Sequence, residues 1–138
     1  MSFDLMFFDP AIVRYQDPNE FLDWFMSTTN WEAPVDYNDP QTASPALQAW
    51  FNEVIAHNPP MNGPLASDDD DSPDVTDYSI APDSIYASYS FSGNQAGIEN
   101  AISQAGKLDI GLFDPQDGTV YLPVDDSDEL RPAFKLEP

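Results

Sequence analysis

Alternating and helix-like spacings of hydrophobic residues predict a succession of strands and helices along the chain. Residues Ser2 to Phe8 are predicted to form a strand with Phe3, Leu5 and Phe7 on one face. Because the residues of the other face are largely apolar too, this strand is predicted to be central in its sheet. Further strands are predicted from the same alternation and from the turn residues between them: 78–80, 85–91, 108–113 and 119–122.

Three segments have the spacing of amphipathic helices. The first is predicted to start at Asp17-Pro18, because Asp17 can cap a helix and Pro18 fits its first position. The second is predicted to start at Ser44-Pro45, and its apolar stripe recurs at i, i+3, i+4 and i+7. That stripe consists of Leu47, Trp50, Phe51 and Val54. The third is predicted to begin near Ser92 to Gln95 and to stop at Gly106.

The order of these elements predicts an α+β fold. Short connections and right-handed crossovers favour an antiparallel-rich sheet with helices packed on one face, in a split β-α-β (ferredoxin-like) outline. We expect a single domain over residues 1–123, which includes a solvated acidic loop at 63–77. Residues 124–138 form an acidic tail that is expected to be ordered only if it docks.

The charge of the chain limits its partners. The 138 residues include 25 Asp and Glu but 4 Lys and Arg, which gives a formal net charge of -21. Such a field repels phosphate backbones and anionic lipids and attracts basic partners. The absence of cysteine, of a long apolar run and of a signal-peptide pattern favours a protein of the cytoplasm.

The two ends of the chain carry a family resemblance. The opening MSFDLMFF and the closing GLFDPQDGTVYLP are similar to a widespread family of small, largely uncharacterised bacterial proteins, which open with MSYDL and close with GL-aromatic-DPQ. The matching segments are Met1 to Phe8, Ser44 to Pro60, Ile85 to Phe91 and Gly111 to Pro123. Members look like the immunity proteins encoded beside secreted-toxin genes, and the resemblance implies that role. The acidic loop lacks the Trp expected of the family, so no role of that residue carries over.

Charge and resemblance together favour an acidic immunity protein that neutralises a cognate secreted bacterial toxin by stoichiometric binding to a basic surface of that toxin, either at its active site or elsewhere. The residues expected to meet the toxin are the carboxylates of the loop and of the tail, with one aromatic residue as the anchor. They are Asp68, Asp69, Asp70, Asp71, Asp74, Asp77, Asp125, Asp126, Asp128, Glu129 and Trp31.

The alternative hypothesis is a small acidic ligand-binding domain or an enzyme. His57, the single histidine, lacks a recognisable nucleophile motif around it, and a helix-terminal structural role is the simpler interpretation. The acidic run could attract Ca²⁺, but it lacks the glycine and the closing glutamate of an EF-hand loop. We therefore expect no catalytic residues, no metal site and no cofactor.

Overall fold

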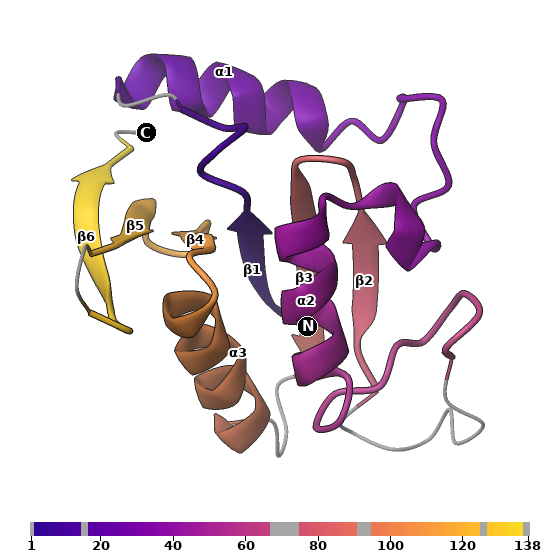
Figure 1. Ribbon diagram of the computed structural model, residues 1–138. Helices are drawn as coiled ribbons and strands as arrows, with labels where there is room; N and C mark the ends of the chain where they lie inside the picture. Colours follow the sequence, from indigo (N-terminus) through magenta and orange to yellow (C-terminus); the bar gives the residue numbers. More distant parts are fainter. Residues whose placement is uncertain (1, 15–16, 67–74, 91–94, 125–126, 137–138) are drawn as a thin grey trace.

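The computed structural model describes residues 2–14, 17–66, 75–90, 95–124 and 127–136 (Figure 1). Within these residues the chain forms six strands, three α-helices and one short 3-10 helix. In chain order they are β1 (Ser2–Phe8), α1 (Pro18–Thr28), η1 (Pro40–Thr42), α2 (Pro45–Val54), β2 (Asp77–Ile80), β3 (Ser84–Ser90), α3 (Gln95–Lys107), β4 (Gly111–Asp114), β5 (Thr119–Pro123) and β6 (Leu130–Lys135).

The strands form one antiparallel sheet in the order β2-β3-β1-β4-β5-β6. β1 is central, as predicted, because it pairs with β3 on one side and with β4 on the other. The α+β class is confirmed. The first four strands of this order, with the helices between β1 and β2 and between β3 and β4, have the connectivity of a split β-α-β fold.

One face of the sheet is covered by α2 and α3, which lie side by side in front of it (Figure 1). The four residues of the predicted α2 stripe are all buried. Trp50 packs on Phe7 of β1 with ring centroids 4.2 Å apart, and its indole N–H donates to the carbonyl of Ala101 in α3 at 3.0 Å. This single side chain therefore connects both helices with the central strand.

The other face is covered by α1, which corrects the expectation that all helices pack on one face. Met6 and Phe8 project to this face from β1 and form a second core with Phe21 of α1 and Phe113 of β4. Phe21 contacts Phe8, Trp24, Phe113 and Phe134 with its ring, in edge-to-face geometry. Because both faces of β1 are apolar, each needs its own cover.

Part of the predicted tail belongs to the sheet. β6 pairs with β5 along its length, and Leu136 beyond it is buried in the core under α1. Gly106 does not end α3, which continues to Lys107. The main chain at Asp128 instead passes so close to Gly106 that a Cβ there would lie 2.1 Å from the Asp128 carbonyl oxygen. Glycine at this position therefore leaves the space that the segment before β6 occupies.

In the segment DPQ, prominent in the family resemblance, Asp114 ends β4 and the next two residues begin the turn that follows. Pro115 has no N–H to continue the β1–β4 pairing. The Gln116 side chain continues it: its amide nitrogen donates to the Asp4 carbonyl oxygen at 2.7 Å, and its oxygen accepts from the Asp4 N–H at 2.9 Å. The turn thus fastens the N-terminal half of β1.

Candidate functional site

Several of the residues predicted to bind a partner lie outside the described residues, namely Asp68 to Asp71, Asp74, Asp125 and Asp126. The positions of the other predicted residues are described by the structure. Asp77 is exposed at the start of β2, and Asp128 and Glu129 are exposed just before β6. Trp31 is partly buried in the loop after α1.

The sheet separates Asp77 from the pair Asp128 and Glu129. β2 and β6 are the two edge strands, and at the usual strand spacing five intervals correspond to about 24 Å. Asp128 and Glu129 also lie near positive charge, since Arg131 follows within three residues and Gly106, which the Asp128 main chain contacts, precedes Lys107. The predicted acidic residues of the two segments therefore do not form one patch within the described part of the chain.

Positive charge is confined to the two ends of the sequence. The Lys and Arg residues are Arg14, Lys107, Arg131 and Lys135, so residues 15–106 contain none, although they hold 15 of the 25 Asp and Glu. The described elements of this interval are α1, η1, α2, β2, β3 and most of α3. We call the surface formed by α1, η1, α2, β2, β3 and their described connecting loops the cation-free surface. Its carboxylates produce a negative field, because the surface contains no Lys or Arg with which they could form ion pairs.

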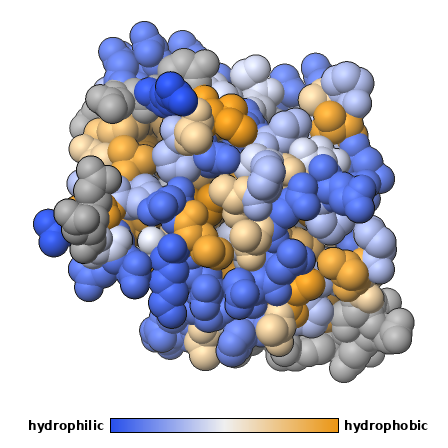
Figure 2. Space-filling view, in the orientation of Figure 1, coloured by the Kyte–Doolittle hydropathy of each residue, from blue (hydrophilic) through white to orange (hydrophobic). Residues whose placement is uncertain are grey.

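Hydrophobic groups interrupt this polar surface only in places. In the view of Figure 2, hydrophilic residues predominate and hydrophobic residues form separate small patches. Exposed large hydrophobic side chains on or beside the cation-free surface include Ile12, which is 53% exposed, and Met26, which is 64% exposed. Scattered exposure of this kind is common on soluble surfaces and does not by itself mark a site.

Trp31 is held in an aromatic cluster. Its ring meets Tyr37 at a centroid distance of 5.3 Å and Tyr86 of β3 at 5.8 Å, both edge to face. Trp31 has a backbone φ of 57°, an uncommon conformation for a bulky residue, and the two ring contacts hold it there. Burial, together with the hydrogen bond to the Asp4 carboxylate, raises the pKa of the Tyr86 hydroxyl above its ordinary value. Trp31 is thus fixed in position, with part of its surface still exposed.

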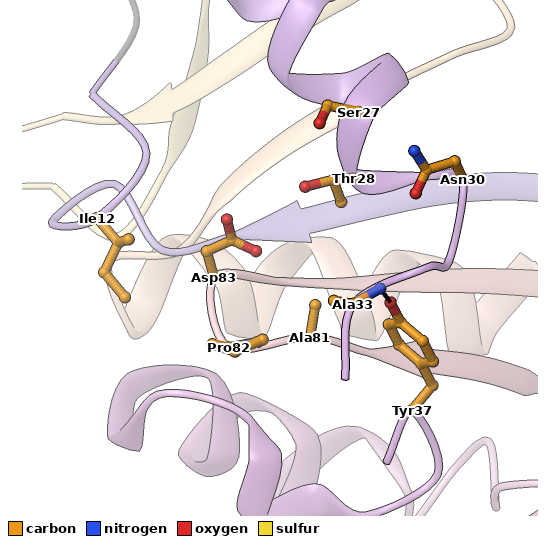
Figure 3. A pocket seen from close by; sticks show the side chains of 9 residues that line it. All are labelled: Ile12, Ser27, Thr28, Asn30, Ala33, Tyr37, Ala81, Pro82 and Asp83. Atoms are coloured by element: carbon orange, nitrogen blue, oxygen red, sulfur yellow. Dashed lines mark hydrogen bonds between the residues drawn. The ribbon is translucent and has the colours of Figure 1, made fainter. Parts of the chain in front are cut away.

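A pocket of about 310 Å³ lies beside this cluster, between the C-terminal end of α1 and the β2–β3 turn (Figure 3). Ile12 borders it at one end and Tyr37 at the other, with Pro82 below. The Asp83 carboxylate lies between these walls and faces the polar side chains of the α1 end (Figure 3). Those polar side chains are Ser27, Thr28 and Asn30.

Hydrogen bonds from three directions fix the Asp83 carboxylate and its turn. The Trp24 indole N–H donates to Oδ2 at 3.0 Å, and the Ser84 hydroxyl donates to Oδ1 at 3.2 Å. The Asp83 carbonyl oxygen accepts from the Asp9 N–H at 3.0 Å, which joins the turn to the end of β1. These donors are all uncharged, and within the described residues Asp83 forms no ion pair.

The opposite wall is fixed equally well. The Tyr37 carbonyl oxygen accepts from the Ile80 N–H at 2.8 Å, and the Tyr37 hydroxyl accepts from the Ala33 N–H at 2.8 Å (Figure 3). The sequence analysis did not predict this pocket, because its walls come from segments that are far apart in the chain. The signal available in the sequence was that Asp83 has no Lys or Arg close to it along the chain, the nearest being Lys107.

His57 is exposed in the turn after α2, where its main-chain N–H bonds to the Val54 carbonyl at 3.0 Å. No group of three or more His, Asp or Glu residues of the described segments could hold a metal ion. No described helix is both long and apolar enough to cross a membrane.

Comparison with known proteins found no matching family model, no similar curated protein and no similar solved structure.

Proposed function

We propose that this chain is an immunity protein, which neutralises a cognate secreted bacterial toxin in the cytoplasm by stoichiometric binding to a basic surface of that toxin. The family resemblance of the chain ends motivates the role. The observation that carries the proposal is the charge distribution behind the cation-free surface: residues 15–106 hold 15 Asp and Glu and no Lys or Arg, which is far more negative charge than solubility requires.

The field of this surface supports fast association. Complementary charge raises association rates by about 10- to 1,000-fold, and an inhibitor that must act before a toxin does damage benefits from that speed. Toxins that act on nucleic acids or nucleotides present Lys and Arg to phosphate groups, and a carboxylate-rich surface complements them. Trp31 supplies a rigid aromatic edge of the kind that holds a complex once it has formed.

The test of the role is co-expression of the chain with the protein encoded by the adjacent upstream gene. If the proposal holds, the chain restores growth to cells that produce this protein, and the two purify together as a stable complex. Failure of both rescue and complex formation, with both proteins folded and expressed, would contradict the role.

Two matched double variants test which surface binds. Asp23→Asn with Glu32→Gln removes two exposed charges of the cation-free surface, and Asp128→Asn with Glu129→Gln removes two exposed charges near β6. The first pair should slow association severalfold and reduce its dependence on salt, because surface charges act mainly on encounter. The second pair serves as the control. An equal or larger effect of the second pair would move the binding surface to the β6 edge.

A further inference from the structure

We infer that the pocket between α1 and the β2–β3 turn receives an arginine side chain of the protein partner, with the guanidinium on the Asp83 carboxylate. The inference rests on the proposed function and deepens it, since it names one anchor of that binding surface. It draws on three properties of the pocket: its unneutralised negative charge, its fixed walls and its size.

The negative charge has two sources. Asp83 has only neutral donors within the described residues, the Trp24 indole and the Ser84 hydroxyl, and a carboxylate has capacity for further donors. The second source is α1, whose C-terminal end borders the pocket and has no basic residue in its last turn. The C-terminus of a helix carries partial negative charge and favours a cation. A cation in this place would therefore interact with both.

The walls suit the rest of an arginine side chain. Ile12 and Pro82 offer apolar surface to its methylene groups, which commonly lie along such surface. Tyr37 offers an aromatic ring, on which a guanidinium plane can stack. Asn30, Thr28 and Ser27 add polar side chains that can accept hydrogen bonds at the rim.

The geometry favours arginine over lysine. A guanidinium carries five N–H donors in a rigid plane, so it can bond to Asp83 and to side chains of the α1 end together. An ammonium group is a compact point charge and lacks this planar arrangement of donors. The volume of about 310 Å³ is at the lower end of small-molecule pockets, which run from about 300 to 1,000 Å³, and so fits one side chain better than a cofactor.

The experiment uses N-acetyl-arginine amide as the probe and follows the ¹H–¹⁵N spectrum of the whole chain at low salt. The indole N–H of Trp24 should shift on titration, because it bonds to Asp83. The indole N–H of Trp50, which bonds to the Ala101 carbonyl in the core, is the internal control and should stay in place. Main-chain signals of residues 27–30, Ala81 and Asp83 should move with the Trp24 signal along one saturable curve.

Two variants with the same chemical change locate the probe. Ser27→Lys places an ammonium at the pocket, whereas Ser103→Lys places one at an exposed position of α3 away from it. Both lower the net negative charge equally. Ser27→Lys should weaken binding of the probe about fivefold or more, and Ser103→Lys should change it little. Asp83→Asn should weaken it as Ser27→Lys does, while Asn retains an oxygen acceptor for the Trp24 indole.

Three results would overturn the inference. The first is equal binding of N-acetyl-citrulline amide, which matches arginine in shape but is neutral. The second is equal binding of N-acetyl-lysine amide, which would mean that the pocket binds any cation and has no preference for a guanidinium. The third is an equal response of Ser27→Lys and Ser103→Lys, which would mean that the probe senses only the overall field. Because the probe needs no toxin, each of these results is independent of the growth-rescue test.

Discussion

The substitution Gly106→Ala has an effect on stability whose sign depends on where residues 127–129 lie. In a helix interior alanine is more favourable than glycine by about 1 kcal/mol. If the acidic segment were a free tail, Gly106→Ala would therefore stabilise the protein. In the structure a Cβ at this position would instead lie 2.1 Å from the Asp128 carbonyl oxygen and 3.0 Å from its carbon.

The magnitude follows from how far these atoms must move. A close C···O contact is about 3.3 Å, so the main chain at Asp128 would have to retreat by about 1 Å. It cannot do so by a side-chain rotation, and it is held by the hydrogen bond from the Val124 N–H to the Glu129 carbonyl oxygen at 3.3 Å. Overpacking of this kind costs about 1–3 kcal/mol. After subtraction of the gain in helix propensity of about 1 kcal/mol, we expect a net loss of stability of up to about 2 kcal/mol.

The assay is urea unfolding of the wild type and of Gly106→Ala. At a slope of about 2 kcal/mol per molar urea, the midpoint should fall by up to about 1 M. Ser103→Ala, at an exposed position of the same helix, is the control and should raise the midpoint slightly. The substitution should also increase the rate of amide hydrogen exchange more in β6 than in β1. A rise in the midpoint of Gly106→Ala, with unchanged exchange in β6, would refute the contact between α3 and this segment.

Three further predictions concern the core and the charge. Trp50→Ala should lower the free energy of unfolding by about 3–5 kcal/mol, because the residue is 0% exposed. Trp50→Phe should lower it less, because a ring remains against Phe7. Equal unfolding midpoints for the two variants would contradict this packing. Stability should fall as the pH rises above about 10, since burial raises the pKa values of Tyr78, Tyr86 and Tyr89 above 10.0 and the unfolded state loses these protons first. Urea midpoints at several alkaline pH values measure this, and Tyr86→Phe should reduce the slope. Added NaCl from about 20 to 300 mM should raise the unfolding midpoint by screening like charges, and a flat trend would show that repulsion is unimportant.

Local chemistry determined where the helices begin. Asp17 accepts from the Asn19 N–H at 2.8 Å and Ser44 from the Leu47 N–H at 3.3 Å, and each is followed by a proline at the first helical position. These interactions span only a few residues, so the sequence predicts them directly. The central place of β1 was predictable for a similar reason, because apolar residues on both sides of a strand require cover on both sides.

Contacts between distant segments decided the rest. The apolar stripe of α1 could have packed on either face of the sheet, and only the space already taken by α2 and α3 directs it to the second face. β6 has no clear alternation, and it forms because β5 and the core under α1 accept it. Gly106 resembles a helix stop in sequence, yet the approach of Asp128 is what requires it.

The candidate site shows the same division. Composition alone determined that the protein is acidic, that residues 15–106 lack Lys and Arg, and hence that a basic partner is favoured. The pocket is built from Ile12, the end of α1, the loop at Tyr37 and the turn at Asp83, which are up to 71 residues apart in the chain. No local pattern relates these segments. They meet because the sheet joins the end of β1 to the β2–β3 turn while α1 packs across the same face, and only that tertiary arrangement places a carboxylate at the end of a helix.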